Sequence, residues 1–90
     1  MNEIEKKFLS DIVAHCFDIP NVTHVHLSKA RPEDGSECFW LAFLICDGQF
    51  SVRLKVPRDE VNLAVYDVAA VYLQKLRDEV HKLKRSKQGF

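Results

Sequence analysis

The chain has 90 residues, of which 47% are apolar and 29% are charged, and its 13 basic side chains balance 13 acidic ones. This length favours one domain over residues 1–90, and this composition is that of a folded globular domain and not of a disordered chain. Zero net charge excludes the overall positive field of a dedicated nucleic-acid-binding protein, so any such role has to be local.

Cysteine usage and hydropathy bear on where the protein acts. The three cysteines have no metal-type spacing, which predicts free thiols and a reducing compartment. No apolar run approaches the length of a membrane span, and the first residues lack the pattern of a secretion signal. We therefore expect a cytoplasmic protein with no membrane association.

The first apolar pattern repeats every four residues and predicts a helix over residues 3–17. Its apolar stripe consists of Ile4, Phe8, Ile12 and Cys16. Asn2 followed by Glu5 is typical of a capping box at the helix start, and Pro20 limits how far the helix can run.

The period then changes to two, which predicts antiparallel strands over residues 21–28, 38–46 and 49–56. Residues 31–36 are charged and rich in turn formers, so we expect an exposed connection there, and Asp47-Gly48 predicts a tight hairpin turn. The second strand is apolar at every position, which favours the centre of the sheet. The face expected in the core carries Val25, Leu27, Phe39, Leu41, Phe43, Ile45, Phe50, Val52 and Leu54.

Pro57 ends the last strand, and residues 58–84 are expected to form one long C-terminal helix with acidic residues in its first turn. The segment 61–73 is apolar on nearly all sides, which indicates contact with more than one neighbour. The predicted fold class is α+β, in the order helix, three-stranded antiparallel sheet, long C-terminal helix (αβββα).

Two apolar surfaces are left over in this arrangement. The first is the opposite face of the sheet, with Trp40, Ala42 and Leu44 down its middle. The second, which we call the helix seam, follows the last helix through Leu76, Val80 and Leu83. The sheet face is covered either by a helix or by a partner, and the helix seam either by the first helix or by another molecule.

This surplus apolar surface favours a non-enzymatic protein-interaction module, expected to be a homodimer or to bind another protein. An adaptor, an inhibitor or a small assembly component, of regulatory or viral origin, fits such a module. The alternative is a nucleic-acid-binding module that stacks bases on an aromatic ring and meets phosphates with cations. The residues that would serve it are His24, His26, Trp40, Arg53, Lys55, Lys82, Lys84 and Arg85.

The order of elements is similar to that of double-stranded RNA-binding domains, and the likeness concerns topology alone. Those domains carry a basic cluster where the last helix begins, whereas this chain reads Arg58-Asp59-Glu60 there. An acidic helix start would repel phosphates, so no residue roles are taken from that family.

The sequence shows no pattern typical of a catalytic or metal site. No glycine-rich phosphate loop, paired acids or nucleophile beside a base is recognisable, so we expect neither an enzyme nor a cofactor. His24 and His26 would project from the same strand face, but two ligands do not make a zinc site, and we expect no metal.

Overall fold

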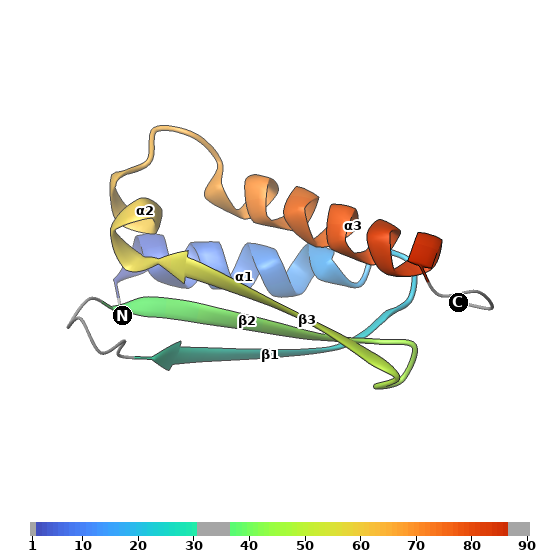
Figure 1. Ribbon diagram of the computed structural model, residues 1–90. Coiled ribbons are helices and arrows are strands. Elements are labelled where there is room, and N and C mark those ends of the chain that lie inside the picture. The colour runs from blue at the N-terminus through green and yellow to red at the C-terminus, as the bar shows by residue number, and fades with distance from the viewer. Residues whose placement is uncertain (1, 31–36, 87–90) are drawn as a thin grey trace.

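A computed structural model describes residues 2–30 and 37–86, and its arrangement of elements confirms the αβββα layout (Figure 1). The elements are α1 (Glu3–Cys16), β1 (Val22–Ala30), β2 (Cys38–Ile45), β3 (Phe50–Pro57), α2 (Arg58–Leu63) and α3 (Val68–Ser86). The expected connection at 31–36 lies outside the described residues. None of the helices in the described ranges is long and apolar enough to cross a membrane.

The three strands form one antiparallel sheet in the order β1-β2-β3, with the wholly apolar β2 in the centre as predicted. Phe43 of β2 is paired with Val25 of β1 and with Val52 of β3, so residues of one parity face the same side. All nine side chains expected on the core face are buried or partly buried in the core.

The turn between β2 and β3 is longer than a two-residue hairpin, because Ile45 and Phe50 form the last strand pair. Cys46, Asp47 and Gly48 all have positive φ, at 54°, 55° and 96°. The Thr23 hydroxyl at the start of β1 accepts a hydrogen bond from the Asp47 N–H at 3.1 Å and donates one to the Leu44 carbonyl at 3.2 Å. These bonds hold the turn against the neighbouring strand.

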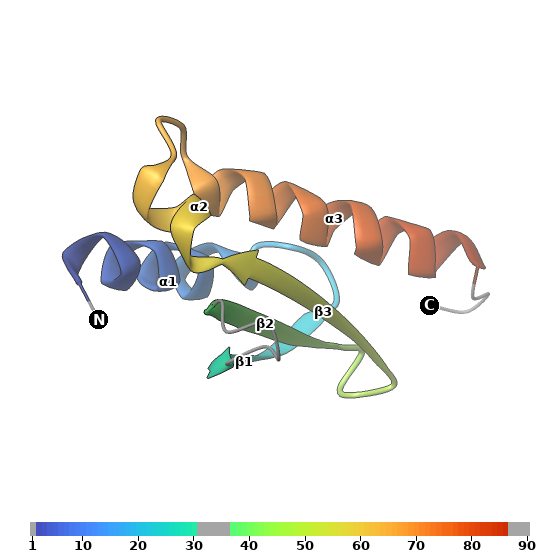
Figure 2. The same cartoon turned by 60° about the vertical axis from the view of Figure 1, so that its left-hand side comes forward.

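Both long helices lie on the same side of the sheet, which Figure 2 shows from a second angle. Phe8 and Ile12 of α1 and Leu73 and Leu76 of α3 join the inner sheet face in a continuous core. The capping box at the start of α1 is present as predicted, since the Asn2 side chain accepts from the Glu5 N–H at 2.8 Å. As far as the structure describes the chain, the opposite sheet face is not covered by a helix.

The expected single helix over 58–84 is wrong in its continuity, because the chain leaves the helix after Leu63 and re-enters it at Val68. Ala64 is extended, with ψ at 143°. The Asp67 carboxylate accepts a hydrogen bond from the Ala70 N–H at 3.1 Å and so caps the start of α3. A short acidic side chain of this kind competes for backbone N–H groups and favours a helix start over a helix interior.

The helix seam belongs to the core of the chain. Leu76 and Val80 are 0% and 6% exposed, and Leu83 packs partly buried against the same core. The sequence allows either the first helix or another molecule to cover the helix seam. In the structure α3 packs against α1 of the same chain. The expectation that Leu76, Val80 and Leu83 bind a partner stays a prediction, and within the single chain Leu76 and Val80 are already buried while Leu83 is partly exposed.

Candidate functional site

The outer face of the sheet, which we call the open face, is the face on which the sequence pattern placed Trp40, Ala42 and Leu44. The described helices do not cover it. The register sets three rows across it, each centred on a β2 residue. These rows are Ser28–Trp40–Lys55, His26–Ala42–Arg53 and His24–Leu44–Ser51. Trp40 and Ala42 are half-buried by their strand neighbours, whereas Leu44 is 39% exposed.

The middle of the open face is hollowed. Ala42 has the smallest side chain of the three central residues and stands beside the ring of Trp40. A shallow hollow of about 350 Å³ lies there, lined by His26, Ser28, Trp40, Leu41, Ala42 and Arg53. An apolar floor with polar groups around it is the usual construction of a site that accepts a side chain from a partner.

The charge of the open face has one sign. Arg53 and Lys55 are exposed on β3, and His24 and His26 are exposed on β1. Among the outward-facing positions of the described strands, not one is occupied by Asp or Glu. A surface with cations on one edge, imidazoles on the other and an apolar centre fits an anionic partner.

The structure does not bring the remaining basic residues to this face. Lys82, Lys84 and Arg85 are exposed near the end of α3, in the helix layer on the far side of the sheet (Figure 1). Lys82 also forms an ion pair with Glu79 at 3.2 Å. A nucleic acid on the open face would therefore meet His24, His26, Trp40, Arg53 and Lys55 but not the α3 cluster.

The two histidines stand side by side without further metal ligands. Within residues 2–30 and 37–86, no three His, Cys, Asp or Glu side chains are grouped so as to hold a metal ion. The thiol of Cys38, at the start of β2, is buried. The His24 ring instead forms a hydrogen bond with the Thr23 hydroxyl at 3.0 Å.

Sequence reasoning missed a polar cluster where α1, α2 and the start of β2 meet. Glu5 is 1% exposed, and its carboxylate accepts hydrogen bonds from Arg58 and, at 3.0 Å, from Asn62. Arg58 also forms an ion pair with Glu37, whose carboxylate lies 3.2 Å from the Lys29 ammonium. The one available signal was the capping-box position of Glu5, which says nothing about a partner fifty-three residues away.

The charges of this cluster stabilise one another. The hydrogen bond from Arg58 holds the pKa of Glu5 at about 2, below the ordinary 4.5, although burial opposes the change. Arg58 likewise lowers the pKa of Glu37, with help from Lys29. Since both carboxylates already hold Arg58, the start of α2 has no free cation to offer a phosphate.

Comparison with models of protein families, with curated proteins and with solved structures finds no match. The functional argument therefore rests on the surfaces of the molecule.

Proposed function

We propose that this protein is a non-enzymatic interaction module whose binding surface is the open face of its sheet. The observation that carries the proposal is the combination of an apolar hollow beside Trp40 with a cationic surround that has no carboxylate among the described outward positions. The partner that fits this chemistry is an acidic protein segment that also carries a large apolar side chain.

Each part of such a partner has a place on the face. Its apolar side chain enters the hollow over Ala42 and packs against the ring of Trp40, where burial supplies most of the free energy. Its carboxylates meet Arg53 and Lys55, which lie on the β3 side of that hollow. These exposed cations contribute mainly to the rate and orientation of docking.

The face is less suited to a second copy of itself. Two open faces placed together would bring Arg53, Lys55 and the two histidines against one another with no acid between them. Like charges opposed at an interface cost free energy, so the charge pattern favours a different molecule on this surface.

A module with such a face could act as an adaptor, an inhibitor or a small assembly component. Its three free thiols suit the reducing cytoplasm.

The single tryptophan makes the proposal testable by fluorescence, because its emission reports on the open face alone. The probe is a short synthetic peptide that alternates Glu with Leu and Phe, and its control replaces each Glu with Gln. We expect a shift of Trp40 emission with the acidic peptide and a much weaker shift with the control.

Two variants locate the binding. Ala42→Leu fills the hollow and should abolish the shift, while Arg53→Glu should weaken binding at low salt. The matched control is Arg77→Glu, an exposed arginine of α3 in the helix layer, which should bind as the wild type does. No emission change with the acidic peptide at low salt would remove the proposal.

The second candidate is single-stranded nucleic acid, favoured by the row in which Trp40 is paired with Lys55. An oligonucleotide of the same net charge as the peptide tests it in the same titration. Its affinity should fall steeply with salt if phosphates are the contacts. Binding of the oligonucleotide, with none of the peptide, would reverse the order of the two candidates.

A further inference from the structure

The outer side of β1 is an unpaired strand edge. In the order β1-β2-β3, β1 pairs with β2 alone, and no strand among residues 2–30 and 37–86 pairs with its other side. Every second residue of such a strand directs its N–H and C=O groups away from the sheet, where another extended chain can bind them. The stretch from His24 to Ser28 is in regular register with β2 and contains no proline, lysine or bulge, the usual devices that protect an edge.

The edge at β3 is protected. This strand carries Arg53 and Lys55 and ends at Pro57, and charged residues and proline both discourage the addition of another strand. The neighbouring helix is also polar, because every exposed side chain of α3 from Gln74 to Arg85 is a polar one. The edge at β1 is therefore the one that can accept a further strand.

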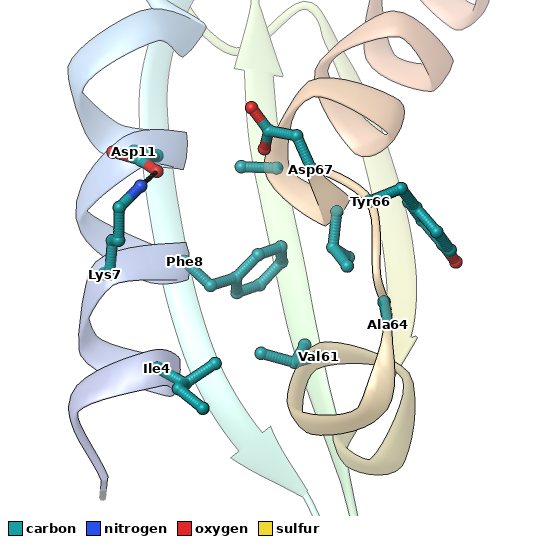
Figure 3. Close-up of a pocket in the computed structure, with 10 residues that line it drawn as sticks. Ile4, Lys7, Phe8, Asp11, Val61, Ala64, Tyr66 and Asp67 are labelled. Carbon is teal, nitrogen blue, oxygen red and sulfur yellow. Dashed lines mark hydrogen bonds and ion pairs between the residues drawn. The ribbon is translucent and has the colours of Figure 1, made fainter.

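The first helix extends beyond the edge of the sheet. α1 packs chiefly on β1 and α3 chiefly on β3, and Figure 3 shows α1 in front of β1 at the margin of the sheet. Neighbouring helix axes lie about 8–10 Å apart, which matches the roughly 10 Å between the first and third strands of a sheet, so the axis of α1 lies over β1. A helix is about 10 Å wide, so its outer half covers a lane of roughly 5 Å, the spacing of one more strand. The described residues place no strand in this lane.

The flank of α1 above this lane is apolar. Phe8 points from α1 toward α3, where its ring lies 6.4 Å from that of Tyr72 (Figure 3). Leu9 and Val13 lie about 100° and 140° further round the helix, on the flank turned away from α3. Leu9 is partly buried, and Val13 is 41% exposed.

The adjoining inner side of β1 is apolar too. Val25 and Leu27 face the core but are only partly buried, although the residues paired with them in β2, Phe43 and Leu41, are 1% and 0% exposed. The core is thus incomplete along this margin. We call the outer edge of β1, together with the Leu9 and Val13 flank of α1, the edge site.

We infer that the edge site binds an extended segment of another protein as a fourth strand of the sheet. The backbone of this segment completes the hydrogen bonds of β1. Its inward residues are aliphatic and pack under Leu9 and Val13. Its outward residues lie beside His24 and His26 at the margin of the cationic open face, so they are acidic.

A second copy of this chain does not fit the edge site. Pairing two β1 strands would set them about 5 Å apart, with an α1 helix above each of them. The axes of two packed helices need about 8–10 Å, so the two α1 helices would collide. The lane accepts a strand that brings no helix on that side of the sheet.

Hydrogen exchange followed by NMR tests the inference, with a synthetic peptide that alternates Val with Glu as the probe. The outward-directed amides of β1 should exchange rapidly in the free protein, and the peptide should slow their exchange at least about tenfold. The protected amides should alternate between His24 and Ser28, because only every second residue directs its N–H outward. The amides of β3 should exchange as before.

Variants locate the binding. Val13→Asp should abolish the protection, because it places a charge over the aliphatic residues of the peptide, and its circular dichroism spectrum should be unchanged because Val13 is exposed. The matched control is Val71→Asp on α3, where the valine is 37% exposed, and it should bind as the wild type does. Ala42→Leu, which fills the hollow of the open face, should also bind normally, so a failure at the edge site is distinguishable from a failure at the open face.

Two N-methylated peptides distinguish strand addition from apolar contact alone. One is methylated at its Val residues and the other at its Glu residues, and only one of these sets directs its N–H groups at β1, so one peptide should lose binding and the other should keep it. Equal binding of the two peptides, normal binding by Val13→Asp, or unchanged β1 exchange at millimolar peptide would overturn the inference. Protection of the same amides by higher protein concentration without peptide would assign the edge to a second copy and would also overturn it.

Discussion

Replacing Glu5 with Gln tests whether the buried carboxylate ties α1 to α2. The fall of its pKa from 4.5 to about 2 is equivalent to between about 3 and 4 kcal/mol at about 1.4 kcal/mol per unit. A third of the Arg58 side chain is exposed, so water screens the pair, and we expect Glu5→Gln to lower the free energy of unfolding by about 1–2 kcal/mol at pH 7.

The pH dependence separates this charge effect from a packing effect. Because the pKa of Glu5 is lower in the folded state, its stabilisation is complete above about pH 4.5 and disappears as the pH falls toward 2. The difference in free energy of unfolding between wild type and Glu5→Gln should therefore shrink over that interval. Urea denaturation at several pH values, monitored by circular dichroism, measures this difference in free energy of unfolding.

The control for this experiment is Glu3→Gln, in the same helical turn but with a side chain that is 91% exposed. It should change the free energy of unfolding by no more than a few tenths of a kcal/mol. Equal losses in the two variants, or a Glu5→Gln difference that stays constant from pH 7 to pH 3, would refute the ion-pair explanation.

Three further experiments test the fold, at Leu76, at Gly48 and at the cysteines. Because Leu76 is 0% exposed, Leu76→Ala should lower the free energy of unfolding by about 2–5 kcal/mol, and Leu76→Asp should prevent folding. Thermal melting that showed a stable, folded Leu76→Asp monomer would contradict this expectation. Gly48→Ala should cost about 1–2 kcal/mol in urea denaturation from backbone strain alone, because φ is +96° and nothing lies within 4 Å of an added methyl group. In the native protein Cys46 should be the first cysteine to react with a thiol reagent, because it is the most exposed of the three. Cys16 should react only on unfolding, because burial hides its thiol and raises its pKa. Mass spectrometry that found Cys16 modified first would contradict the structure.

The sheet was predictable because its signals are local. Alternation in β1 and β3 and the unbroken apolar run of β2 predict which side chains share a face, and the register agrees from His24 onward, after a shift between Val22 and His24. The start of α1 was predictable for the same reason, since a capping box is complete within four residues.

What could not be predicted depends either on an ambiguous local signal or on contacts distant in sequence. Asp67 reads equally well as a polar residue inside a helix or as the cap of a new one, and Ala64 and Val65 give no turn signal. Nor does any local pattern say that Arg58 reaches Glu5, or that α1 rather than a second molecule covers Leu76. That both helices choose the same side of the sheet is likewise a tertiary outcome.

The central claim is that the open face of the sheet binds a partner, and NMR shift mapping with the acidic peptide tests it most directly. The perturbed resonances should alternate along the strands. They should belong to His24 and His26 of β1, to Trp40, Ala42 and Leu44 of β2, and to Arg53 and Lys55 of β3. The inward-facing Leu41 and Phe43 should change least. Perturbations confined to Leu63–Tyr66 or to the end of α3, with the alternating set unmoved, would contradict the account.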